Sequence, residues 1–116
     1  MPAASRPFLS LRVILRKGVA FGPGKAELLE HILAAGSIAA AGRKMGMSYT
    51  RAWSLVDTMN RGFASPLVAS AKGGAQRGGA ALTPLGEEVL RLYRRMEMAA
   101  ARAAAKDLKA LKARLR

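Results

Sequence analysis

Residues 36–54, GSIAAAGRKMGMSYTRAWS, decide the fold that we predict for this chain. Ser37 is a good N-cap directly after a glycine that suits a helix C-cap, and a short helix over residues 38–45 is expected to follow. Gly46 then turns the chain, and Ser48 caps a further helix. Two short capped helices joined by a tight glycine-containing turn are typical of a helix-turn-helix.

The apolar positions of these two helices predict how they pack. The first has small residues on its inward face, which let another helix approach closely. In the second, Trp53 lies between the inward stripe and the exposed face, where either packing or DNA contact is geometrically possible, and we favour packing. The inward positions are Ile38, Ala41, Gly42 and Met45 in the first helix and Ala52, Val56, Met59 and Phe63 in the second.

The sequence before this motif predicts one strand and one helix. Apolar and polar residues alternate over residues 9–16, the pattern of a strand with one buried face. After a break rich in glycine and proline, apolar residues recur at helical spacing over residues 25–35. The inward side chains are expected to be Leu9, Leu11, Val13 and Leu15 in the strand and Leu28, Leu29, Ile32 and Ala35 in the helix.

The sequence after the motif predicts a β-hairpin and a long last helix. Residues 67–71 and 80–82 can pair around a glycine-rich loop to form a wing, whose backbone can approach a nucleic-acid groove. Thr83 suits the N-cap of the last helix, with Pro84 at its first position. Apolar residues at alternating intervals of four and three then predict a dimer interface along this helix, formed by Leu85, Val89, Leu92 and Met96.

These elements predict a mainly α fold with a small β component, a winged helix-turn-helix with a long C-terminal dimerisation helix. The length of 116 residues fits one domain. We expect a flexible arm at residues 1–7, the DNA-binding domain at residues 8–97 and a basic helical extension at residues 98–116.

The charge indicates the partner. Twenty Lys and Arg against seven Asp and Glu give a net charge of +13, which favours a nucleic acid. The chain has no cysteine for a disulfide framework, no apolar run long enough to span a bilayer and no secretory segment at its start, so we expect a cytoplasmic, nucleoid-associated protein.

Enzymatic and metal chemistry have few candidates in this sequence. His31 is the single histidine, there is no thiol, and the acidic residues fall mostly on exposed helix faces. The glycine-rich loop lacks the Gly-Lys-Ser/Thr ending of a phosphate-binding loop. We therefore expect no catalytic residue, no metal ligand and no nucleotide site.

Candidate DNA contacts lie at the start of the first helix of the motif, on the helix after Ser48 and in the wing. The helix after Ser48 would enter the major groove, where its first turns meet base edges and phosphates. Thr50 and Ser54 point farthest from the core and are expected to read bases, whereas Arg51 could bond a guanine or a phosphate. The full set of expected contacts is Ser37, Ser48, Tyr49, Thr50, Arg51 and Ser54, with Lys72, Gln76 and Arg77 in the wing.

The segment GSIAAAGRKMGMSYTRAW, the glycine-rich wing leading into LTPLG, and the spacing between them resemble the DNA-binding domain of the ModE family of molybdate-responsive regulators. The resemblance covers about residues 9–97. A broader resemblance extends to the LysR-type regulators. The resemblance to the ModE family implies a bacterial homodimer that binds a roughly palindromic operator. No part of the sequence matches the oxyanion-binding domains of molybdate-sensing members, so we expect no cofactor and no direct molybdate binding.

Three functions stay open at this stage. The first is a site-specific transcriptional regulator linked to molybdenum or another metal oxyanion, with its signal supplied by a separate effector-sensing protein. The second is an architectural DNA-binding protein whose basic tail binds any sequence through counterion release. The third is an adaptor that docks on a partner through its last helix.

Overall fold

The structure is a computed structural model that describes residues 9–71 and 79–116. The expected flexible arm, residues 1–7, and the wing loop lie outside these ranges. The elements are, in order, β1 (Val13–Arg16), β2 (Val19–Phe21), α1 (Pro23–Ala35), α2 (Ile38–Lys44), α3 (Tyr49–Gly62), β3 (Val68–Ala71), β4 (Gly79–Leu82) and α4 (Pro84–Lys112). The predicted mainly α fold with a small β component is confirmed.

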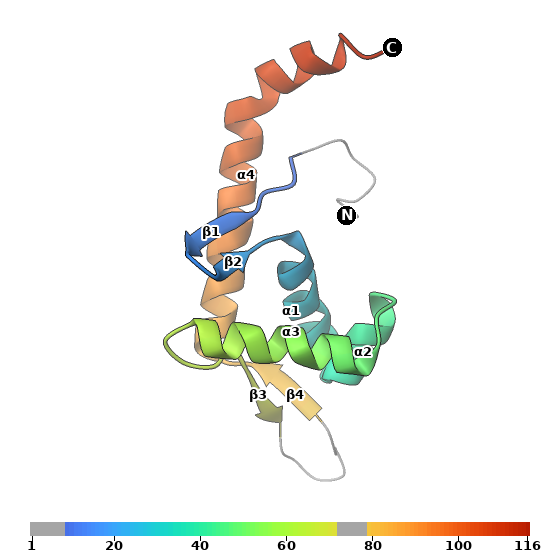
Figure 1. Ribbon diagram of the computed structural model, residues 1–116, viewed down its shortest axis with the longest axis vertical. Helices are drawn as coiled ribbons and strands as arrows, with labels where there is room; N and C mark the ends of the chain where they lie inside the picture. Colours follow the sequence, from blue (N-terminus) through green and yellow to red (C-terminus); the bar gives the residue numbers. More distant parts are fainter. Residues whose placement is uncertain (1–8, 72–78) are drawn as a thin grey trace.

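Two regions differ in how much they pack (Figure 1). Helices α1, α2 and α3 and the two hairpins gather around the first half of α4 and form what we call the head. The second half of α4 extends alone to the C-terminus, which lies far from α3 and from the β3–β4 hairpin. The molecule therefore measures 55 Å along its longest axis and 28 Å along the next.

The head has one apolar core that fixes the orientation of α3. Leu28, Leu29 and Ile32 of α1 are fully inaccessible to solvent, and Val56 and Met59 of α3 pack against them. Burying a side chain of this size stabilises the fold by about 1.5–3 kcal/mol. The other buried apolar residues are Phe21, Ala26, Ala41, Ala52, Leu67, Val68, Ala80, Leu82, Leu90 and Tyr93.

The helix-turn-helix is confirmed, with both predicted serine caps. The hydroxyl of Ser37 accepts a hydrogen bond from the amide of Ala40, which starts α2. Gly46 turns the chain with a φ of +70°, a conformation that side chains other than glycine rarely adopt. A Cβ added to Gly42 would lie 3.1 Å from the Cβ of Ala52, so a residue without a side chain lets α2 approach α3.

The strand predicted over residues 9–16 forms only over Val13–Arg16. The chain forms an antiparallel hairpin, β1–β2, and the second strand was missed. The register shifts between Ile14 and Arg16, as at a β-bulge, and this interrupts the alternation of faces. Leu15, predicted to face the core, is consequently 52% exposed, and Phe21 of the missed strand is buried instead.

The start of α1 differs from the prediction, whereas its end at Ala35 agrees with it. The helix begins at Pro23, whose ring suits the first helical position, and not at residue 25. At its other end Gly36 adopts a left-handed conformation and its amide donates to the carbonyl of Ile32. Ala35 thus occupies the last position of the helix and is exposed, although the periodicity predicted it to be inward.

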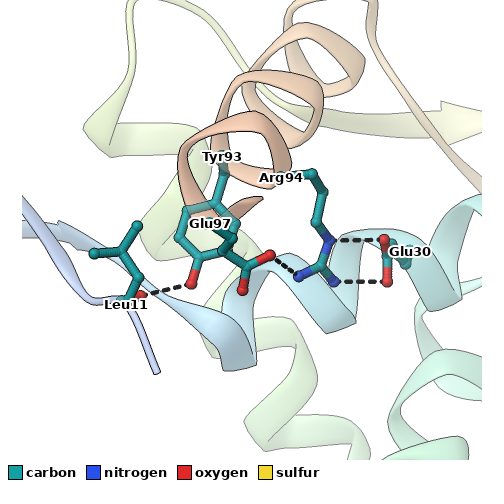
Figure 2. Close-up of polar contacts among 5 residues, drawn as sticks. All are labelled: Leu11, Glu30, Tyr93, Arg94 and Glu97. Carbon is teal, nitrogen blue, oxygen red and sulfur yellow. Dashed lines mark hydrogen bonds and ion pairs between the residues drawn. The ribbon is translucent and has the colours of Figure 1, made fainter. Parts of the chain in front are cut away.

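The first half of α4 is fixed to the head by two neighbouring polar side chains, which Figure 2 shows leaving the helix toward different elements. The hydroxyl of Tyr93 donates to the carbonyl of Leu11 over 2.5 Å. Arg94 donates from two nitrogens to the carboxylate of Glu30 on α1, at 2.9 and 2.7 Å, and from a third to Glu97 at 2.6 Å. These bonds orient α4 relative to α1.

Candidate nucleic-acid interface

One side of α3 faces solvent along the first two turns of the helix. Tyr49, Thr50, Arg51 and Ser54 are all exposed there, as the sequence predicted. On the opposite side Ala52, with Val56 and Met59 further along, holds the helix against the core. The exposed side combines hydroxyl groups, a guanidinium and an aromatic ring, which are groups that can bond base edges and phosphates.

Two of the expected DNA contacts, Ser37 and Ser48, also cap helices, and this limits the hydrogen bonds that they can make to DNA. Ser48 caps α3, and its hydroxyl accepts from the amide of Arg51 over 3.1 Å. A hydroxyl keeps one proton to donate while it accepts, so the exposed Ser48 can still donate to a phosphate. Ser37 is half-buried at the start of α2, next to Gly79 of β4, and is the less accessible of the two.

The prediction that Trp53 packs into the core is wrong, because its side chain is 44% exposed. It follows Ala52, which is buried, and precedes Ser54, so the turn of the helix places it beside the hydroxyl-bearing surface. The helical period indicated an intermediate position, and its apolar character favoured packing. A large exposed aromatic ring on this surface is suited to apolar contact with a base or a sugar.

The β3–β4 hairpin is held at a fixed position beside α3. The side-chain oxygen of Asn60 on α3 accepts from the amides of Leu67 and Val68, and its nitrogen donates to the carbonyl of Val68. On the other side of the hairpin the amide of Ala80 donates to the carbonyl of Gly36 over 2.8 Å. The base of the wing is therefore bonded both to α3 and to the connection between α1 and α2.

The predicted strands of the wing are confirmed, with Val68–Ala71 paired to Gly79–Leu82. The three wing residues expected to contact DNA, Lys72, Gln76 and Arg77, lie outside the described residues. Their assignment stays a prediction.

Several basic side chains of the head differ in how free they are to bind an anion. Arg43 and Lys44, at the end of α2, are exposed and lie just before the turn into α3. Arg61 pairs with Asp57 at 2.9 Å on the surface of α3. Lys25 instead donates to the carbonyl of Ala20, and burial together with the nearby charge of Arg12 lowers its pKa. Lys25 thus stabilises the start of α1.

The predicted dimer seam divides into two parts in the structure. Leu85 and Val89 are half-buried and pack against the core of the head, whereas Leu92 and Met96 are each 45% exposed. An apolar groove of about 140 Å³ lies beside the exposed pair. Its lining residues are Val13, Leu15, Phe21, Phe63, Val89, Leu92, Tyr93 and Met96.

Within residues 9–71 and 79–116, no three His, Asp or Glu side chains gather as they would around a metal ion. Helices in the same ranges are too short or too polar to cross a bilayer.

The arrangement of α2, α3, the β3–β4 hairpin and α4 defines a winged helix-turn-helix followed by a long helix. A comparison of solved structures agrees with this class. The chain is similar to one in a crystal structure of the CbnR_DBD–DNA complex, with a TM-score of 0.60 and 19% identity, over 76% of this chain and 95% of that chain. The likeness establishes the fold.

In sequence, the chain is similar to molybdenum-related proteins, although no protein-family model matches it. It is 42% identical over 90 residues to the molybdenum-pterin-binding protein MopB of Rhodobacter capsulatus, a match that covers 78% of this chain and 33% of MopB. It is 40% identical over 81 residues to the molybdenum transport protein ModE of Azotobacter vinelandii, covering 70% and 30%.

A third relative is a regulator. The DNA-binding transcriptional dual regulator ModE of Escherichia coli (strain K12) is 39% identical over 71 residues, covering 61% of this chain and 27% of that protein. The chain therefore spans about a third or less of the length of these relatives. The resemblance to ModE-type proteins is confirmed over the matched region.

Proposed function

We propose that this protein is a bacterial transcriptional regulator that binds specific sites on duplex DNA, with α3 as its recognition helix. The observation that carries the proposal is the exposed side of α3, which presents Tyr49, Thr50, Arg51 and Ser54 while its other side is fixed in the core. A helix held in this way can enter the major groove. The net charge of +13 supports an anionic partner.

The exposed side chains of α3 fall into those assigned to base edges, which can distinguish DNA sequences, and those assigned to phosphates, which cannot. Thr50 and Ser54 project from the first two turns and are assigned to base edges, where a hydroxyl can donate or accept. Arg51 is assigned to a guanine or a phosphate, and the donating hydroxyls of Ser48 and Tyr49 to phosphates. Trp53 joins this set as an apolar contact, because the structure leaves its ring exposed.

The proposal includes a homodimer on an approximately palindromic operator. The exposed pair Leu92 and Met96 and the adjoining groove form one apolar surface. A second copy related by a two-fold axis would cover this surface and place two copies of α3 in successive major grooves. The names of the relatives support a link to molybdenum or another metal oxyanion, with a separate protein as the sensor.

Selection of bound duplexes from a random DNA library tests sequence specificity. Enrichment of a two-fold symmetric motif, with half-sites about one helical turn apart, is expected. Equal binding to all duplexes, with the same steep salt dependence, would contradict the regulator and favour an architectural DNA-binding protein. The fluorescence of Trp53, the single tryptophan, follows binding at α3 directly.

Substitutions on one helix test the assignment of base contacts. Thr50→Ala and Ser54→Ala are expected to change the preferred bases, with a loss of about 1–3 kcal/mol on the selected site. Thr58→Ala is the matched control, because this exposed threonine lies on the same helix beyond the first two turns and donates to the carbonyl of Ser54. Uniform weakening across all sequences would contradict a base-reading role.

Sedimentation equilibrium tests the dimer independently of DNA. Met96→Glu places a charge in the proposed interface and should yield a monomer at concentrations where the unsubstituted protein is a dimer. Leu115→Glu is the control, since Leu115 is 75% exposed and lies beyond α4. A dimer that withstands Met96→Glu would refute this interface.

A further inference from the structure

A basic face runs along α4 from Arg91 into the second half of the helix, and the packing of the head does not use it. Arg91, Arg95, Arg102, Lys106 and Lys109 are all exposed. At about 100° per residue these five positions fall within a sector of roughly 60° around the helix. They follow the helix axis for about 27 Å. We call this set the basic stripe.

No residue of the basic stripe forms an ion pair within the described part of the molecule, and the exposed Glu87 and Glu88 lie one helical turn before Arg91, beside that end of the stripe only. The ion pairs of residues 9–71 and 79–116 involve Arg61 and Arg94, and none involves a residue of the stripe. Asp107 lies about 130° around the helix from the centre of the stripe. Arg94 shows the contrast, because its bonds to Glu30 and Glu97 raise its pKa and tie it to the head.

The spacing of these charges lowers the stability of the helix that carries them. Arg91 and Arg95, Arg102 and Lys106, and Lys106 and Lys109 are like-charge pairs at separations of three or four residues. Such pairs face each other and destabilise an isolated helix. A bound row of negative charges would remove this repulsion.

The far end of the stripe is too distant to assist DNA bound at α3. Lys109 lies about 38 Å along α4 from Pro84, several times the screening length of about 8 Å at physiological ionic strength. Figure 1 shows this end of α4 pointing away from α3 and the β3–β4 hairpin. These charges therefore need an anion of their own.

Dimerisation through α4 would leave the stripe accessible. Leu92 and Met96 lie about a quarter of a turn around the helix from the stripe. A second copy seated on them would not cover the basic face.

We propose that the basic stripe binds the phosphate backbone of a second DNA duplex, so that a protein bound through α3 to one duplex holds another beside it. The linear row of exposed charges, without hydrogen-bonding groups arranged to read bases, fits a repeating backbone of negative charge. The inference rests on the proposed DNA-binding function of α3. It adds a second, sequence-independent contact along α4, which extends away from α3.

A bridging assay tests it. A duplex carrying the selected site is fixed to beads, the full chain is bound and washed, and capture of a fluorescent duplex without the site is measured. Five phosphate contacts predict that the affinity for the second duplex falls with salt with a logarithmic slope of about −4.5. Arg102→Gln with Lys106→Gln should reduce capture at least tenfold and the slope by about two.

A charge-matched variant separates the stripe from general electrostatics. Arg114→Gln with Arg116→Gln also removes two positive charges, but from exposed residues beyond α4, and should leave capture within about twofold. Equal losses in the two double variants would overturn the stripe as a site. The second α3 of a dimer could also capture the fluorescent duplex. Both double variants keep α3 intact, so capture by that route would be unchanged in both variants. Unchanged capture in both would therefore also overturn the proposal.

Two further outcomes decide between partners and between proposals. Binding to vesicles with anionic lipids that depends on Arg102 and Lys106, without capture of DNA, would replace the duplex by a membrane surface. Failure to hold the first duplex would overturn the proposed function of α3 instead. The two double variants would then test the stripe in direct binding to a duplex in solution.

Discussion

The head and the second half of α4 are built on different principles, although one continuous helix joins them. In the head, side chains from every element meet in a single core, and Tyr93 and Arg94 fasten α4 to it. Beyond about residue 98 the helix has exposed alanines and lysines, and Leu111 is 67% exposed. The fold of the head is determined by burial, whereas the second half of α4 is helical through local propensity.

This difference predicts where the molecule tolerates change. A helix without tertiary contacts frays independently, so substitutions in it should leave the unfolding of the head unaltered. Substitutions at the contacts that join hairpin, α3 and α4 should instead lower the stability of the whole head. Variants in both regions test the comparison, and we take them in order of expected effect.

The largest effect is expected at Gly86, in the first turn of α4. A Cβ at this position would lie 2.1 Å from the carbonyl oxygen of Leu67, which also accepts a hydrogen bond from the amide of Thr83. The backbone must move to admit it, so Gly86→Ala should destabilise the head by about 3–5 kcal/mol. Thermal unfolding measures the loss. Gly24→Ala, at a helical position with nothing within 4 Å, is the control and should be neutral or slightly stabilising.

Asn60→Ala tests whether the hairpin depends on α3. The substitution removes three hydrogen bonds. The amides of Leu67 and Val68 and the carbonyl of Val68 then lack the side chain of Asn60 as a partner. The expected loss is about 2–3 kcal/mol in urea unfolding. Hydrogen exchange should show the amides of Leu67 and Val68 losing protection first. Unchanged exchange there would mean that the hairpin holds its position without Asn60.

Tyr93→Phe tests the link between α4 and the chain before β1. Below pH 10 the loss of the bond to Leu11 should cost about 1 kcal/mol. Burial, with the nearby carboxylate of Glu97, raises the pKa of Tyr93 to about 12. Because this value is above the ordinary value of 10, the contribution of the phenol is complete below pH 10 and is lost as the pH rises toward 12.

The pH dependence itself provides the check. Urea unfolding between about pH 9 and pH 11.5 should show a decline in stability that is smaller in Tyr93→Phe. Tyr49→Phe is the matched control, because that tyrosine is 54% exposed on α3. An identical decline in both variants would assign the effect to other groups.

The parts of the fold that the sequence predicted are those in which local signals and burial agree. Ser37, Ser48 and Thr83 each cap the predicted helix, and the stripe through Ala52, Val56 and Met59 is buried. The missed strand β2 has only three residues, too few for a periodic pattern. The bulge in β1 breaks an alternation that the sequence shows intact, and only pairing with β2 reveals it.

The candidate site divides in the same way. The exposed positions on α3 follow from the helical period once the inward stripe is known. Trp53 sits at the border of that stripe, where the period does not decide, and its exposure depends on how the neighbouring elements fill the core. The hydrogen bonds from the amides of Leu67 and Val68 to the side chain of Asn60 join residues seven and eight apart across a turn, and no periodic pattern predicts them.

Ala103→Gly should have the smallest effect on the head and is the sharpest test of the comparison. Ala103 is exposed in the second half of α4, where glycine disfavours the helix by about 1 kcal/mol relative to alanine. The helical circular dichroism signal should fall slightly while the midpoint of thermal unfolding stays constant, because no core contact is lost. Ala52→Gly, at a fully buried position of α3, should lower that midpoint by several degrees. A similar shift for both would show that the second half of α4 unfolds together with the head, as expected if a second copy packs along its whole length.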